Sequence, residues 1–209
     1  MASDPEAGAG SPEPRGDRIL TIPNVITVVR LALLPVFVWL LLVQDDRANA
    51  AWLLAALATT DFFDGYIARH FNQVSELGKV LDPVADRLLF FVGVGSILID
   101  GSVPVWFAVA VLVREVLVAG ATLTLAAMGA ARIDVTWFGK AGAFGLMMAF
   151  PLFLASHAPQ SDLSWSGSAD TFAWLTGIPG LLLSWYSLLL YVPLARQALR
   201  DGRAERALA

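Results

Sequence analysis

The chain has 209 residues, of which 57% are hydrophobic and 15% charged, and its mean hydropathy is +0.66. Soluble domains average about half apolar and roughly a quarter charged residues, so this composition indicates a protein that lies in a bilayer. The net charge of -4 argues against a nucleic-acid-binding protein, which normally carries a basic patch. The absence of cysteine excludes disulfides, thiolate metal sites and cysteine nucleophiles.

The first 19 residues are rich in Pro, Gly, Ala, Ser and charged residues, a composition that cannot bury a core. We therefore predict a disordered cytoplasmic tail over residues 1–19. A cleaved signal peptide needs a basic start followed directly by an apolar stretch, whereas the first apolar run begins only near Leu20. The first helix is thus expected to remain as a membrane anchor.

Apolar runs long enough to cross about 30 Å of hydrocarbon predict an all-α polytopic membrane protein. Six transmembrane helices are expected, at residues 22–43, 50–68, 80–99, 104–130, 138–156 and 171–195. They form one predicted membrane domain over residues 20–195, followed by a basic cytoplasmic tail over 196–209. Three spaced glycines, Gly139, Gly142 and Gly145, are expected to allow close helix packing in the fifth span.

The distribution of Lys and Arg predicts the orientation of these helices. With the amino terminus inside, the outer loops are 44–49, 100–103 and 157–170, and Arg47 is the one basic residue in them. Most of the other basic residues lie in the tails and inner loops, as the positive-inside rule requires. Both termini are therefore predicted to be cytoplasmic, and the connection between the second and third spans faces the same side.

Two pairs of aspartates flank that connection. Asp61 and Asp64 are three residues apart on one predicted helix, and Asp82 and Asp86 are four apart on the next, so each pair shares a helix face. Four ionised carboxylates at a membrane edge repel one another unless they are protonated or paired with cations. Divalent Mg²⁺ or Mn²⁺ resolves this, because both ions prefer hard oxygen ligands and pairs of them bind phosphates in phosphoryl-transfer sites. The alternative is that the carboxylates are solvated at helix ends.

A longer pattern contains both pairs. Its fixed positions are, in order, Asp61, Asp64, Gly65, Ala68, Arg69, Gly78, Asp82 and Asp86. This spacing resembles the signature D-x-x-D-G-x-x-A-R-x8-G-x-x-x-D-x-x-x-D of the CDP-alcohol phosphatidyltransferase family, with every defining position present. The six-helix layout extends the resemblance over roughly residues 20–195.

Members of this family move a phosphatidyl or related phosphoryl group from a CDP-linked donor to an alcohol and release CMP. The resemblance implies two metal ions, Mg²⁺ or Mn²⁺, one held by Asp61, Asp64 and Asp82 and the other by Asp61, Asp82 and Asp86. It also implies that Asp86 is the general base that accepts the proton of the acceptor hydroxyl. The residues it implies for binding CDP-diacylglycerol are Asn24, Val25, Ile26, Thr27, Gly65, Ala68, Arg69, Ser75 and Gly78.

Three sequence features indicate which kind of alcohol is the acceptor. The stretches LDPVADR, TIPNVITVVRLALLPVF and VREVLV resemble the bacterial phosphatidylglycerophosphate synthase and cardiolipin synthase branch, which implies a glycerol-type acceptor. Glycerol 3-phosphate is the first expectation, with Arg114, Lys140 and Arg132 as candidates to bind its phosphate. Thr122 stands where phosphatidylglycerophosphate synthases typically have an arginine, so phosphatidylglycerol, the acceptor of a cardiolipin synthase, is the alternative. Arg114 and Glu115 could also form an intramembrane ion pair without contacting substrate.

The remaining expectations concern partners and location. The resemblance implies a homodimer in the plasma membrane, with the active site on its cytoplasmic side. A cation-coupled carrier is a competing class, because carriers also use intramembrane carboxylates. The chain shows no internal repeat, and its acidic residues lie at predicted helix ends rather than at the bilayer midplane.

Overall fold

The structure is a computed structural model that describes residues 22–71, 76–128 and 136–208. Within these ranges, the side chains of residues 22–24, 61–71, 76–84, 126 and 196–208 are not described. Ser75 and Arg132, two of the predicted site residues, lie outside the described residues altogether.

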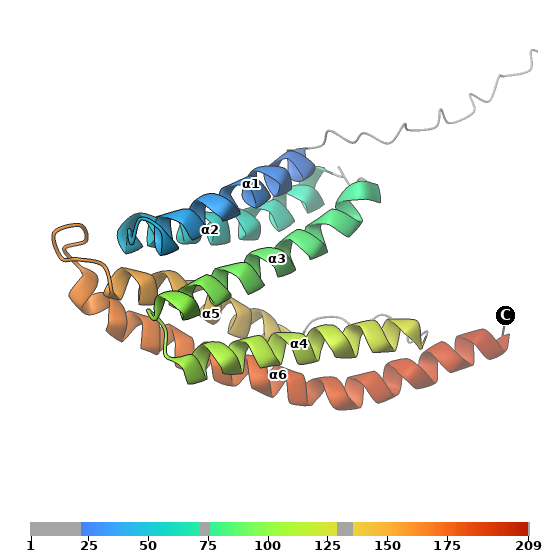
Figure 1. Cartoon of the computed structure of the whole chain (residues 1–209). Helices are drawn as coiled ribbons and strands as arrows, with labels where there is room; N and C mark the ends of the chain where they lie inside the picture. Colours follow the sequence, from blue (N-terminus) through green and yellow to red (C-terminus); the bar gives the residue numbers. More distant parts are fainter. Residues whose placement is uncertain (1–21, 72–75, 129–135, 209) are drawn as a thin grey trace, which may run out of the picture.

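Six helices and no strand make up the described part of the chain (Figure 1). They are α1 (Ile22–Leu42), α2 (Arg47–Phe71), α3 (Glu76–Asp100), α4 (Val105–Ala127), α5 (Trp137–Ser156) and α6 (Ser166–Leu208). The predicted all-α class is confirmed, and each predicted span corresponds to one helix. The largest difference is at the end of α6, which continues past the predicted limit of 195 into the basic tail.

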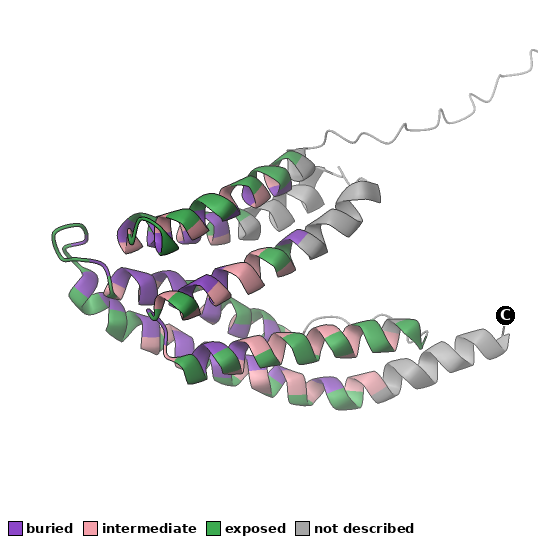
Figure 2. Cartoon of the chain, viewed as in Figure 1, coloured by how far each residue is buried: buried purple, intermediate pink, exposed green. Residues whose placement is uncertain are grey.

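The helices form two packed groups that meet through α5. α1 packs against α2 and α3, and α5 packs most extensively against α6. Contacts of α2 with α5, and of α4 with α3 and α6, join the groups into one bundle (Figure 1). Buried residues gather along α5 and on the helix faces turned toward it, whereas large parts of α1 and α4 are exposed (Figure 2).

Small residues allow α5 and α6 to approach backbone to backbone. A Cβ added at Gly142 would lie 2.7 Å from the Ser184 amide nitrogen, and one added at Gly180 would lie 2.8 Å from the Leu146 nitrogen. A Cβ at Gly145 would lie 2.9 Å from the Gly180 Cα atom. The packing role predicted for Gly142 and Gly145 is confirmed, and Gly180 supplies the matching surface on α6.

An aromatic cluster holds α4 against α5 and α6. Phe107 is fully buried, with ring centroids 5.5 Å from Phe153, 5.8 Å from Trp174 and 6.1 Å from Phe150. All three pairs are edge-to-face, the geometry that the ring quadrupoles favour. This cluster fixes the first turns of α4, which carries Arg114 and Glu115 further along.

Ion pairs close the end of the bundle where the α1–α2 and α3–α4 turns meet. Arg47 Nη2 lies 3.0 Å from Asp100 Oδ1, and the Asp100 side chain is only 3% exposed. The Ser102 hydroxyl also donates to Asp100, and Asp45 contacts Arg47 from the other side. Asp46 accepts a hydrogen bond from the Asn49 backbone N–H at 3.0 Å, which caps the start of α2. Two of the three predicted outer loops, 44–49 and 100–103, therefore lie together at one end of the molecule.

Within the described part of the chain, four helices are long and apolar enough to cross a membrane. These are α1, α4, α5 and α6, whose apolar windows are Val25–Leu42, Val105–Leu125, Trp137–Ser156 and Ser166–Ala195. The chain is therefore a helical membrane protein, and its exposed apolar residues on α1 and α4 have the character expected of lipid-facing surfaces.

Candidate active site

Asp86, the predicted general base, is held by a buried arginine. Arg30 Nη1 donates to Asp86 Oδ1 at 2.9 Å, which joins α1 to α3. The Arg30 side chain is 4% exposed, whereas the Asp86 side chain is 49% exposed. A guanidinium in an apolar helix is costly unless it is paired, so the carboxylate stabilises Arg30, and Arg30 in turn fixes the orientation of one carboxylate oxygen.

Arg30 is the residue that sequence reasoning missed. Thr27 and Arg30 are both buried and lie three residues apart, on one face of α1. Thr27 was predicted only as part of a donor-binding segment, and Arg30 was given no role. A charged residue inside an otherwise apolar first span is itself a signal of function, and it would have identified this position.

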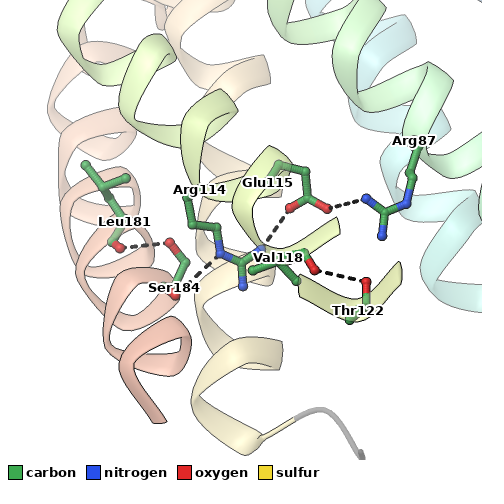
Figure 3. A network of polar contacts seen from close by, with 7 residues as sticks. All are labelled: Arg87, Arg114, Glu115, Val118, Thr122, Leu181 and Ser184. Atoms are coloured by element: carbon green, nitrogen blue, oxygen red, sulfur yellow. Dashed lines mark hydrogen bonds and ion pairs between the residues drawn. The ribbon is translucent and has the colours of Figure 1, made fainter. Parts of the chain in front are cut away.

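A second polar group joins α4 to α3 and α6 (Figure 3). Glu115 Oε2 accepts a hydrogen bond from Arg114 Nη1 at 2.8 Å, and Glu115 Oε1 lies 3.6 Å from Arg87 Nη1. Arg114 Nε also approaches the Ser184 carbonyl on α6, at 3.4 Å. One carboxylate therefore lies between two guanidinium groups from different helices, and the predicted ion pair of Arg114 and Glu115 is confirmed.

Both polar groups open onto one cavity of about 480 Å³ between α2, α3, α4 and α5. Its polar lining among the described residues consists of Asp86, Arg87, Arg114 and Glu115. The rest of the lining is apolar and includes Leu54, Phe90, Val94, Ile97, Val111, Leu146, Met147 and Phe150. A volume of this size with a few convergent polar groups is typical of a ligand site, and the apolar part suits a hydrocarbon chain.

Lys140 and Thr122, the other described positions that bear on the acceptor, lie away from this cavity lining. Lys140 is exposed on α5 and is absent from the residues that line the cavity. The Thr122 hydroxyl donates to the Val118 and Ala119 carbonyls, each at 2.9 Å, so it is satisfied within its own helix. Arg114 is thus the predicted acceptor residue that the structure brings to the cavity.

The predicted donor and metal residues are described to different extents. Asp61, Asp64, Gly65, Ala68 and Arg69 belong to α2, and Gly78 and Asp82 belong to α3, but their side chains lie outside the described part. Asn24 begins the same turn of α1 as Val25, Ile26 and Thr27, which are exposed, half-buried and buried. Among the side chains that are described, no three acidic or histidine residues gather into a metal-binding group. The described side chains do not include those of Asp61, Asp64 and Asp82, three of the four motif aspartates.

Comparison with known proteins shows which family the chain belongs to. The family model for CDP-alcohol phosphatidyltransferases matches residues 20–197. A relative from Streptomyces coelicolor, named cardiolipin synthase (CMP-forming), is 36% identical over 189 residues, which cover 88% of this chain and 86% of the relative.

Two further relatives have the names of two different enzymes. A Mycobacterium tuberculosis relative, provisionally named as a cardiolipin synthase, is 41% identical over 139 residues, 66% of this chain and 66% of its own length. The chain thus spans just under two thirds of that relative. A Bacillus subtilis relative named CDP-diacylglycerol--glycerol-3-phosphate 3-phosphatidyltransferase is 32% identical over 155 residues, 68% of this chain and 80% of the relative.

Proposed function

We propose that this chain, which belongs to the CDP-alcohol phosphatidyltransferase family, transfers the phosphatidyl group of CDP-diacylglycerol to a glycerol-type acceptor and releases CMP. One observation carries the proposal. Asp86 is the last aspartate of the family motif, and it lies half exposed at the polar end of a largely apolar cavity, where a buried arginine orients it. That is the setting a base needs when one substrate is a lipid and the other offers a hydroxyl group.

The helix bounds support a two-metal site at the motif. α2 ends at Phe71 and α3 begins at Glu76, so Asp61 is as far from the end of its helix as Asp86 is from the start of the next. At 1.5 Å per residue, that distance is about 15 Å along each axis, and for Asp64 and Asp82 it is about 10 Å. The two helices run in opposite directions (Figure 1). Asp61 and Asp86 are therefore at similar heights along their helices, and so are Asp64 and Asp82.

The donor set fits hard divalent cations. We propose that Asp61, Asp64 and Asp82 hold one Mg²⁺ or Mn²⁺ ion and that Asp61, Asp82 and Asp86 hold a second. Such ions, when bound, neutralise the charge of the donor pyrophosphate and of the leaving CMP. The donor-binding residues proposed beside them are Asn24, Val25, Ile26, Thr27, Gly65, Ala68, Arg69, Ser75 and Gly78.

The chain's own residues then account for the transfer of the proton from the attacking hydroxyl group. The acceptor hydroxyl oxygen attacks the phosphorus nearer the diacylglycerol, the bond from that phosphorus to the bridging oxygen breaks, and CMP leaves. Asp86 accepts the hydroxyl proton, while Arg30 keeps its carboxylate directed toward the cavity. No covalent intermediate on the protein is needed.

Phosphatidylglycerol is the acceptor that we favour, with glycerol 3-phosphate as the second candidate. The Streptomyces coelicolor relative, which matches most of this chain, is named a cardiolipin synthase. The apolar cavity also suits an acylated acceptor better than a small polar one. The Bacillus subtilis relative keeps glycerol 3-phosphate, the first expectation from the sequence, as the alternative.

The proposed topology has six crossings with both termini in the cytoplasm. α2 and α3 each contain 25 residues, about 37 Å of helix, which is long enough to cross the hydrocarbon. The pair of Arg47 and Asp100 joins two turns at one end of the bundle, as alternating crossings require. We further propose a plasma-membrane homodimer with a cytoplasmic active site, a disordered tail over 1–19, a membrane domain over 20–195 and a basic cytoplasmic tail over 196–209.

The test is to reconstitute the purified protein in liposomes with CDP-diacylglycerol and Mg²⁺ and to measure CMP and the lipid product. Phosphatidylglycerol and glycerol 3-phosphate are supplied separately. We expect CMP release only when an acceptor is present, with cardiolipin as the main product. Cation flux across the liposomes without CMP formation would identify a carrier instead.

A further inference from the structure

We propose that Glu115 sets the charge of the acceptor that this site accepts, and that it selects a singly charged phosphodiester lipid over a doubly charged phosphomonoester. The inference rests on the proposed phosphatidyltransferase function. It assigns Glu115, which neither the sequence motif nor the proposed mechanism uses, as a specificity-determining residue.

Three charged side chains at the polar end of the cavity, Arg87, Arg114 and Glu115, together carry one net positive charge. Asp86 is paired with Arg30, so these two groups cancel. Arg87 and Arg114 contribute two positive charges, and Glu115, which contacts both, removes one. The group formed by Arg87, Arg114 and Glu115, all three of which line the cavity, therefore carries a single net positive charge.

Neither arginine is fully occupied by Glu115. The 3.6 Å separation between Glu115 Oε1 and Arg87 Nη1 is too long for a hydrogen bond. This Nη1 atom is buried and has no hydrogen-bond acceptor within the described part of the chain. The Arg87 side chain as a whole is 41% exposed, so the guanidinium is open to a ligand, and a phosphate oxygen is the acceptor that guanidinium groups bind best.

The phosphate groups of the two candidate acceptors differ in charge. A phosphodiester carries one negative charge, whereas the phosphomonoester of glycerol 3-phosphate, with a second pKa near 6, is close to doubly charged at pH 7. One net positive charge balances the diester and leaves the monoester with an excess negative charge in a site of low polarity.

The apolar part of the cavity indicates the same class of ligand. The wall that continues from Arg87 and Arg114 is formed by Phe90, Val94 and Leu146, among other apolar residues. A fatty-acyl chain fits this wall, and glycerol 3-phosphate has none. The occupant is therefore a phospholipid whose phosphate meets the two arginines and whose headgroup carries the free hydroxyl.

Two substitutions add a positive charge by independent routes. Glu115→Gln removes the carboxylate between the arginines and keeps a side chain of the same shape. Thr122→Arg adds a cation two turns further along α4, at a position where the native hydroxyl bonds only to its own helix among the described contacts (Figure 3). Asp170→Asn is the charge-matched control, because it also removes one negative charge but lies exposed near the start of α6.

The readout is kcat/KM for CMP release with phosphatidylglycerol, with glycerol 3-phosphate and with glycerophosphoglycerol, the deacylated diester. We expect Glu115→Gln and Thr122→Arg each to shift the ratio of glycerol 3-phosphate to phosphatidylglycerol by roughly tenfold or more toward the monoester, and Asp170→Asn to leave it unchanged. We also expect glycerophosphoglycerol to be used with a higher KM than phosphatidylglycerol.

Each outcome bears on a different claim. CMP release with an unshifted acceptor ratio in both variants would overturn the role of Glu115 and leave the proposed function standing. No CMP release by the unsubstituted protein with any acceptor would overturn the proposed function and this inference with it. Equal use of glycerophosphoglycerol and phosphatidylglycerol would overturn the acyl-chain site. Thr122→Arg keeps the charge test decisive if Glu115→Gln does not fold.

Discussion

Replacing Arg30 with methionine should slow turnover while leaving the fold largely intact. Methionine keeps an unbranched apolar stem in α1 but removes the guanidinium that donates to Asp86 Oδ1 at 2.9 Å. Because Asp86 is 49% exposed, water can replace the lost partner, so the stability cost should be near or below about 1 kcal/mol. The carboxylate would lose its fixed orientation, which is where the functional loss arises.

The size of that loss follows from the strength of the contact. A hydrogen bond to a charged group contributes about 1.5–3 kcal/mol, which corresponds to a fall in kcat of roughly 10- to 150-fold if it is needed to orient the base. Arg30→Lys keeps a cation with a different reach and should restore part of the rate. The assay is kcat and KM for CMP release per folded molecule, alongside thermal unfolding in the same detergent.

Arg47→Met is the matched control at the opposite end of the bundle. It also removes an arginine from an ion pair, but its partner Asp100 is 3% exposed and would be left as a buried carboxylate. We expect it to lose about 3 kcal/mol of stability and to keep its turnover per folded molecule. Unchanged kcat in Arg30→Met, or an equal fall in kcat in Arg47→Met, would refute the role assigned to Arg30.

Two further predictions test the packing of the bundle and the metal requirement. Gly180→Ala should destabilise the protein by about 1–3 kcal/mol, because its Cβ would lie 2.8 Å from the Leu146 nitrogen. In contrast, Gly95→Ala, with nothing within 4 Å of the added Cβ, should be neutral or stabilising in the same thermal unfolding measurement. Chelation with EDTA should abolish CMP release, and added Mg²⁺ or Mn²⁺ should restore it, whereas activity that survives chelation would contradict the two-metal proposal.

The helices could be predicted from the sequence because their signals are local. Apolar run length predicted the six elements to within a few residues at most ends. α2 begins at Arg47, three residues before the predicted start, because Asp46 caps it there. The predicted end of the sixth span at 195 coincides with the end of the apolar window of α6 at Ala195, but the helix itself continues to Leu208, because the basic residues after 195 end the apolar run and not the helix. Helix propensity and membrane hydropathy are different signals at that point.

The contacts within the site could be predicted only in part. The adjacent Arg114 and Glu115 suggested an ion pair on their own helix, but the approach of Arg87 from α3 depends on how α3 packs beside α4. The pairing of Arg30 with Asp86 joins residues 56 positions apart, so no local pattern specifies it. Gly180 was likewise not predicted, because its packing role exists only opposite the glycines of α5.

The most direct test of the central claim is the rate of CMP release by the unsubstituted protein and by Asp86→Asn, measured together with CDP-diacylglycerol, Mg²⁺ and phosphatidylglycerol. Asparagine keeps the shape of the side chain but cannot accept the acceptor's proton as a carboxylate does. We predict acceptor-dependent CMP release from the unsubstituted protein and a loss of roughly 100-fold or more in the variant. Full turnover by Asp86→Asn, or CMP release that needs no acceptor, would contradict the account.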